Sequence, residues 1–132
     1  MSRNPENLEV FHLADALVAQ VYRWTQGFPP EERYGLQSQL RRAAVSIATN
    51  IVEGCSRTST KDYLRFMEIA RGSAQEVKYL LGLSRRLGFL AEDSQATLEL
   101  ANRVAKALQG LQAALSTVAL SPEARSPKPE AP

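Results

Sequence analysis

The sequence predicts an all-α protein built as an antiparallel up-down-up-down four-helix bundle. In four long segments apolar residues recur every three or four positions, and no segment shows the alternation of a strand. The connections between these segments are short, which favours antiparallel neighbours. With 132 residues, 44% of them apolar, the chain has enough material for one ordinary core. We therefore expect one domain over residues 1–120.

The chain after this domain has a different composition. Residues 121–132 contain four prolines and no large apolar side chain. Such a segment buries too little apolar surface to order itself. We predict a disordered tail there.

The first predicted helix covers residues 8–25. Phe11, Ala14, Val18 and Val21 form its inward face. The sequence Gly-Phe-Pro-Pro at 27–30 ends this helix, because proline cannot continue it.

The second predicted helix covers residues 32–54, with Gly54 as its C-terminal cap. A start after a short irregular turn at Tyr34-Gly35 is the alternative. Its inward face is apolar, yet polar residues recur beside that face at the same spacing. Buried polar groups are costly unless they find partners. We predict a structural polar network that this row forms with the third helix, made by Arg42, Ser46, Asn50, Glu53, Ser73 and Glu76.

The third and fourth predicted helices cover residues 59–87 and 93–118. Ser59 precedes Asp62 by three residues, the spacing of a capping box. Gly88 followed by Phe89 is typical of a Schellman motif, in which a left-handed glycine ends a helix.

Both central helices are apolar on more than one face, which is typical of helices buried on two sides. One bundle cannot cover both sides, so we predict self-association into a closed ring or a dimer. The expected oligomer interface comprises Val45, Ala48, Val52, Ile69, Gly72 and Leu83.

Catalytic and metal-binding motifs do not stand out. His12 is the only histidine and Cys55 the only cysteine, so the chain cannot hold the two Glu-x-x-His motifs of a di-iron bundle, and no glycine-rich phosphate loop occurs. We therefore expect no enzyme activity, no cofactor and no metal site. The chain has no apolar run long enough to cross a membrane, and its N-terminus lacks a signal-peptide pattern, so we expect a cytoplasmic protein.

Charge is unevenly distributed along the chain. Residues 34–90 carry nine basic and four acidic residues, a net charge of +5. Arg57, Lys61 and Arg65 are spaced to converge at the start of the third helix, where they would neutralise phosphates without reading bases. The expected nucleic-acid-binding residues are Arg41, Arg57, Lys61, Arg65 and Arg71. An ordinary solvated surface is the alternative interpretation.

Three segments, which follow one another along the chain, resemble a known family. They are Phe28-Pro-x-Glu-Glu-x-Tyr-Gly-Leu36, Gln39-x-x-Arg-Ala-Ala-Val-Ser-Ile47 and Asn50-Ile-x-Glu-Gly-x-x-Arg57, and the likeness continues through Ser59-x-Lys-Asp-Tyr63. They are similar to the bacterial four helix bundle protein family, which includes proteins encoded in intervening sequences of large-subunit rRNA genes. It also includes the accessory variability determinants of diversity-generating retroelements. The likeness covers residues 8–118.

The resemblance implies a cytoplasmic four-helix bundle that assembles into a homopentamer. In the retroelement branch it further implies a basic surface that binds RNA or DNA and a reverse transcriptase, although this chain is only mildly basic. No member is expected to be an enzyme by itself. The alternative function is a scaffold bundle whose partner is another polypeptide.

Overall fold

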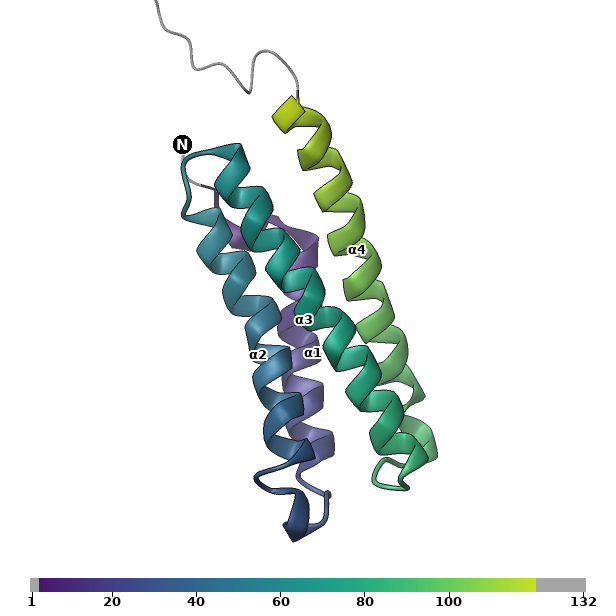
Figure 1. Ribbon diagram of the computed structural model, residues 1–132. Coiled ribbons are helices and arrows are strands. Elements are labelled where there is room, and N and C mark those ends of the chain that lie inside the picture. Colours follow the sequence, from purple (N-terminus) through teal and green to yellow (C-terminus); the bar gives the residue numbers. More distant parts are fainter. Residues whose placement is uncertain (1–2, 121–132) are drawn as a thin grey trace, which may run out of the picture.

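The computed structural model describes residues 3–120 and shows four long helices running alternately up and down (Figure 1). The predicted tail at 121–132 lies outside the described residues. Three short 3₁₀ turns precede α1, α2 and α4. In chain order the elements are η1 (Pro5–Asn7), α1 (Glu9–Thr25), η2 (Pro30–Glu32), α2 (Leu36–Cys55), α3 (Thr60–Arg86), η3 (Glu92–Ser94) and α4 (Gln95–Leu120).

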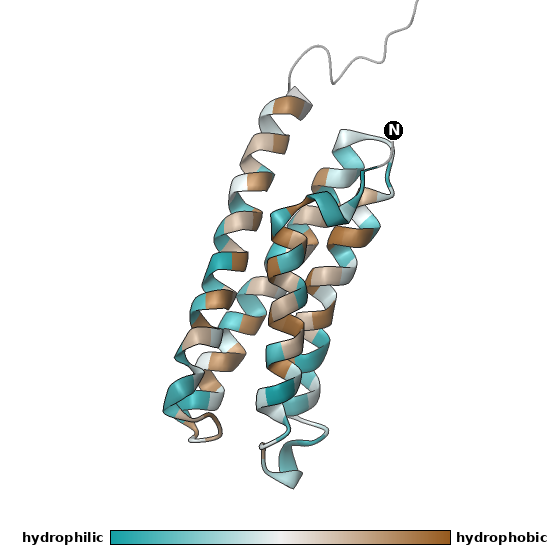
Figure 2. Ribbon diagram, turned by 180° about the vertical axis from the view of Figure 1, so that it is seen from behind, coloured by the Kyte–Doolittle hydropathy of each residue, from teal (hydrophilic) through white to brown (hydrophobic). Residues whose placement is uncertain are grey.

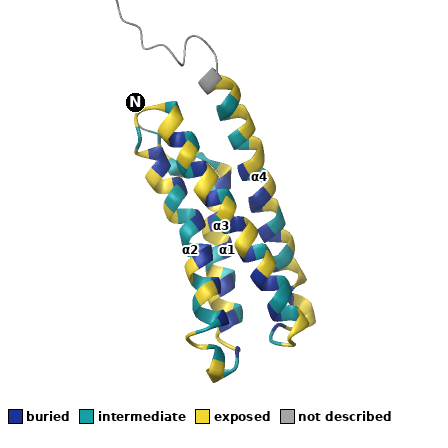
Figure 3. Ribbon diagram, viewed as in Figure 1, coloured by how far each residue is buried: buried dark blue, intermediate teal, exposed yellow. Residues whose placement is uncertain are grey.

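The predicted fold class is confirmed, since the described residues form an antiparallel bundle of α-helices without a strand. Each helix packs against two others, with α2 and α4 as neighbours of both α1 and α3. Buried positions recur on the inward side of every helix (Figure 3), and apolar residues recur with the same spacing (Figure 2). The largest fully buried apolar side chains are Leu17, Val21, Leu40, Ile47, Ile51, Met67, Val77, Leu81, Val104 and Leu108.

The ends of α3 follow the predicted capping chemistry. The Ser59 hydroxyl accepts a hydrogen bond of 3.0 Å from the Asp62 N–H. At the other end Gly88 has a φ of +81°, a conformation that glycine adopts at little cost. The Phe89 N–H donates to the Ser84 carbonyl at 2.9 Å and the Gly88 N–H to the Arg85 carbonyl at 3.0 Å, which is the Schellman pattern.

The start of α2 differs from the prediction. Residues 30–32 form the 3₁₀ turn η2, and α2 begins only at Leu36. The Glu32 carboxylate accepts a hydrogen bond of 3.0 Å from the Leu36 N–H, which satisfies a free donor at the helix start.

The prediction that Gly54 caps α2 was wrong. The helix continues through Cys55, and Gly54 is buried within its last turn. A β carbon at residue 54 would lie 2.7 Å from the Met67 Cε atom and 2.9 Å from the Phe66 Cβ atom. Gly54 therefore allows α2 and α3 to approach closely, which is a tertiary requirement rather than a local one.

Candidate nucleic-acid interface

The turn between α2 and α3 gathers basic side chains at one end of the bundle. The guanidinium carbons of Arg57 and Arg65 lie 4.7 and 5.4 Å from the centroid of the same Phe66 ring. Lys61 and Arg65 are exposed and line one surface hollow of about 410 Å³, together with Asp62, Leu64 and Glu68. The structure thus brings together the three residues whose convergence the sequence predicted.

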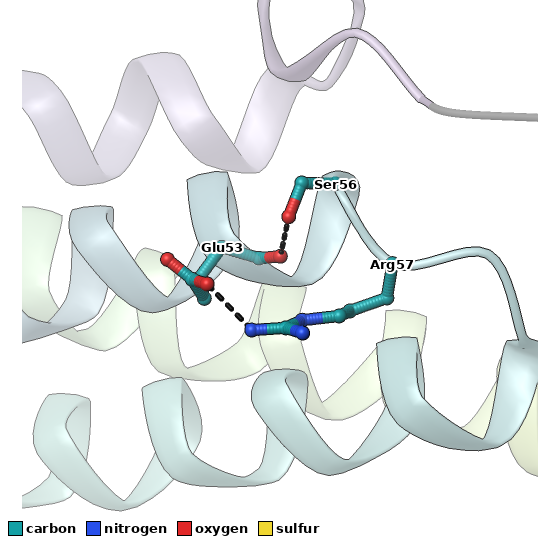
Figure 4. Close-up of polar contacts among 3 residues, drawn as sticks. All are labelled: Glu53, Ser56 and Arg57. Carbon is teal, nitrogen blue, oxygen red and sulfur yellow. Dashed lines mark hydrogen bonds and ion pairs between the residues drawn. The ribbon is translucent and has the colours of Figure 1, made fainter.

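Arg57 is held in place by the last turn of α2. Its Nη2 atom lies 2.5 Å from the Glu53 Oε2 atom, and the Ser56 hydroxyl donates to the Glu53 carbonyl at 2.7 Å (Figure 4). The ion pair is exposed to water, so it contributes little to stability, about 0–1 kcal/mol. Its main effect is to hold Arg57 over Phe66.

Arg3 joins this end of the bundle, which sequence reasoning missed. Its backbone N–H donates to the Cys55 carbonyl at 3.0 Å, and its Nη1 atom donates to the Arg57 carbonyl at 3.2 Å. Its guanidinium carbon lies 4.0 Å from the centroid of the Tyr63 ring. We call Arg3, Arg57, Lys61 and Arg65 the basic end. No periodic pattern could have placed Arg3 there, since it precedes the first helix by several residues.

Two buried titratable groups, the Cys55 thiol and the Tyr63 hydroxyl, lie near Arg3 of the basic end. Burial raises the pKa of the Cys55 thiol, and the nearby Arg3 charge and a hydrogen bond with Tyr63 offset only part of that effect. Burial likewise raises the pKa of the Tyr63 hydroxyl. Cys55 is therefore protonated at neutral pH and unsuited to act as a nucleophile.

His12 does not serve Cys55 as a base. Its Nε2 atom lies 2.8 Å from the Glu6 carbonyl oxygen, and its ring packs edge-on against Phe11. Within residues 3–120 no group of three or more His, Cys, Asp or Glu side chains is placed to hold a metal ion. The described residues also include no helix long and apolar enough to cross a membrane.

The other two basic residues of the predicted set lie elsewhere. The Arg41 Nε atom donates to the Thr25 hydroxyl at 2.8 Å, near the opposite end of α2. The Arg71 Nη1 atom donates to the Gln112 Oε1 atom at 2.9 Å and so ties α3 to α4. The five predicted residues therefore do not form one continuous surface.

Comparison with known proteins identifies the family. The profile of the 23S rRNA-intervening sequence protein family matches residues 6–110, which is most of the chain. The protein belongs to this family. The resemblance stated from the sequence is thereby confirmed.

A solved structure shows the same fold. It is a protein of unknown function from the S23 ribosomal protein family of Bacteroides thetaiotaomicron, with a TM-score of 0.72 and 19% sequence identity. The alignment covers 79% of this chain and 95% of the other. A comparison with curated proteins finds no match.

In this member of the intervening sequence protein family, the predicted polar row divides into three parts. The hydroxyls of Ser46 and Ser73 lie 2.8 Å apart, and the Asn50 side chain donates to the Ser46 hydroxyl at 3.0 Å. Glu53 is paired with Arg57 instead. Arg42 and Glu76 line a hollow of about 370 Å³ beside the two serines, together with Gln39 and Ala43. Neither side chain makes a hydrogen bond or ion pair among residues 3–118.

The residues expected at an oligomer interface also divide in exposure. Val52 and Ile69 are 45% and 46% exposed, and Gly72 is open to solvent. Val45, Ala48 and Leu83 are half-buried, and the last two pack against the core of their own bundle. Of the six residues, Val52 and Ile69 are thus the large apolar side chains that remain exposed and free to meet a partner.

Proposed function

We propose that this intervening sequence protein is a non-catalytic accessory protein of the cytoplasm that binds the phosphate backbone of structured RNA through its basic end. The observation that carries the proposal is the convergence of Arg57, Lys61 and Arg65 on one end of the bundle, around Phe66 and its neighbouring hollow. Exposed Lys and Arg side chains release counterions from phosphates when they bind, without requiring a particular base sequence. The family name places its members in intervening sequences of 23S rRNA, which makes a structured RNA the first nucleic acid to test.

Acidic residues near the basic end reduce its attraction for phosphates. Glu53 already pairs with Arg57, and Asp62 and Glu68 line the same hollow as Lys61 and Arg65. Lys61 and Arg65 have no ion pair among residues 3–118, so they remain available for phosphates. We expect binding that is measurable at low salt and weakens steeply as salt rises.

A salt series with matched variants tests this proposal. Fluorescence anisotropy would follow a labelled RNA hairpin at about 50 and 150 mM salt, a range over which phosphate contacts lose much of their strength. Lys61→Ala and Arg65→Ala should each weaken binding and reduce the salt slope by about one. Arg103→Ala and Lys106→Ala remove exposed cations from α4 and should change little. Absence of binding at both salt concentrations would eliminate the proposal.

Self-association is part of the same proposal. Val52 and Ile69 expose apolar side chains on the two central helices, and a ring of bundles would cover them. The family resemblance implies a homopentamer. Light scattering of the purified protein gives the oligomer number, and Val52→Glu with Ile69→Glu should lower it. A particle of 14.6 kDa, the mass of one chain, at micromolar concentration would contradict the ring.

The alternative function is a scaffold that binds another polypeptide and no nucleic acid. The exposed apolar side chains of Val52 and Ile69 favour it, because each could be covered by a protein partner. For the retroelement branch that partner would be a reverse transcriptase. Co-purification that survives nuclease treatment and is lost in Val52→Glu supports the scaffold, whereas co-purification abolished by nuclease supports RNA binding.

A further inference from the structure

A second basic surface lies on the first turns of α2, away from the basic end. Seven residues line a hollow of about 310 Å³ there, and we call it the tyrosine hollow. They are Tyr22, Arg33, Tyr34, Gln37, Ser38, Arg41 and Arg42. Three of them are arginines and none is acidic, in contrast to the hollow at the basic end, which Asp62 and Glu68 also line.

One wall of the tyrosine hollow is fixed by contacts between α1 and α2. The Arg41 guanidinium carbon lies 4.4 Å from the centroid of the Tyr22 ring, well within the range of a cation–π contact. The Arg41 Nε atom donates to the buried Thr25 hydroxyl at 2.8 Å, and its Nη2 atom donates to the Tyr22 carbonyl at 3.3 Å. Arg41 and Tyr22 therefore present a preorganised cationic and aromatic surface.

The other aromatic side chain, Tyr34, is held out into solvent. It is 88% exposed, so the bundle gains almost no packing from its ring. The turn that carries it is nevertheless well hydrogen-bonded, because the Gly35 N–H donates to the Glu32 carbonyl at 3.1 Å and the Leu36 N–H to the Glu32 carboxylate at 3.0 Å. The Arg33 guanidinium carbon lies over one face of the ring, 5.6 Å from its centroid.

We propose that the tyrosine hollow binds unpaired nucleotides of an RNA strand. An exposed aromatic ring beside arginines is the arrangement on which unpaired bases stack while cations contact the backbone. Tyr34 offers an open ring to a base, and Arg33 and Arg42 lie beside it for the phosphates. The Arg42 side chain makes no hydrogen bond or ion pair among residues 3–118, so it is free to contact a phosphate. Gln37 and Ser38 add side-chain donors and acceptors for a base edge.

This inference deepens the proposed function and rests on RNA being the ligand. The two surfaces lie near opposite ends of α2, whose 20 residues span about 30 Å at 1.5 Å per residue. A backbone-binding surface at one end and a base-stacking surface at the other suit an RNA in which a duplex stem continues into a single strand. A fully paired RNA would engage the basic end alone.

Three RNAs separate the two surfaces in an anisotropy experiment. They are a blunt hairpin, the same hairpin with an unpaired 3′ tail of about 12 nucleotides, and the free tail strand, whose length falls within the usual site size. Wild-type protein should bind the tailed hairpin more tightly than the blunt one. Tyr34→Ala should weaken tailed-hairpin binding by about 5- to 150-fold, the range that stacking of one base supplies, and leave blunt-hairpin binding unchanged.

Matched variants keep the test specific. Tyr34→Phe retains the ring and should bind the tailed hairpin like the wild type. Arg42→Gln should weaken tail binding, whereas Arg103→Gln on α4 should not. Because Tyr34 is exposed, its variants should melt at the wild-type temperature, which circular dichroism checks.

The outcomes show which of the two surfaces binds RNA. Equal wild-type affinity for the blunt and tailed hairpins, or wild-type binding of the tailed hairpin by Tyr34→Ala, would overturn the tyrosine hollow. Binding of the free tail that depends on Tyr34, without any binding of the blunt hairpin, would support the hollow and refute the role of the basic end. Failure of all three RNAs to bind would refute both.

Discussion

Met67 on α3 packs directly against Gly54 on α2, so closely that a β carbon on residue 54 would lie 2.7 Å from the Met67 terminal methyl. The Met67 side chain is flexible and could move, but the Phe66 Cβ atom at 2.9 Å is bonded directly to the backbone and moves only with α3. Gly54→Ala should therefore separate α2 from α3. We expect a loss of about 1–3 kcal/mol from overpacking, reduced by the roughly 1 kcal/mol that alanine gains in a helix. Urea unfolding measures the net change.

Gly110 provides the matched control. It lies within α4, is exposed, and a β carbon there would meet no atom within 4 Å. Gly110→Ala should stabilise the protein by about 0.5–1 kcal/mol through helix propensity alone. If both glycine variants shifted the unfolding midpoint in the same direction, the close packing at Gly54 would not be the cause.

These two glycines show what the sequence could and could not predict about the fold. Helix spacing, the Ser59 cap and the Gly88 stop are local patterns, so they were readable without coordinates. The sequence around a glycine near a helix end does not show whether it caps the helix or allows a close helix contact, because glycine suits both roles. Only the position of Met67 decides that Gly54 serves packing.

The candidate sites were less predictable for the same reason. The spacing of Lys61 and Arg65 on one helix is local, and the structure places both beside one hollow. Arg41 and Arg71 are basic in sequence, but their partners Thr25 and Gln112 come from other helices and hold them elsewhere. Such long-range pairings carry no sequence pattern that helical spacing could detect.

The hydroxyls of Ser46 and Ser73 join the two central helices at 2.8 Å, and a double-mutant cycle should detect that contact. Ser46→Ala and Ser73→Ala should each cost about 0.5–1.5 kcal/mol, since the remaining hydroxyl loses its partner. The double variant should cost less than the sum. As a control, Thr49→Ala removes a hydroxyl bonded to the Val45 carbonyl of its own helix and should be additive with Ser73→Ala. Strict additivity of the two serine variants would show that the hydroxyls are not coupled.

Thr97 links α1 to α4 through two hydrogen bonds. Its buried hydroxyl accepts from the Trp24 indole N–H at 2.8 Å and donates to the Gln20 Oε1 atom at 2.5 Å. Thr97→Val keeps the shape but leaves the indole N–H without its partner, so we expect a loss of about 1–3 kcal/mol. Fluorescence of Trp24, the only tryptophan, follows the unfolding. Thr97→Ser retains the hydroxyl and should lose less stability than Thr97→Val. Equal losses in the two variants would show that packing, and not the hydrogen bond, causes the effect.

The buried pair of Cys55 and Tyr63 should make the protein less stable in alkali. Burial raises the pKa of both groups above their ordinary values of 9.0 and 10.0. As pH rises past those values the unfolded chain loses these protons before the folded protein does, so the free energy of unfolding falls with pH. Their contribution is complete below about pH 9 and is lost as pH rises through the folded pKa values. Urea unfolding at pH 8 and pH 10 should show the fall, and Cys55→Ala should make it shallower because one of the two groups is gone. A variant that lost as much stability over this interval as the wild type would exclude Cys55 as a source of the alkaline sensitivity.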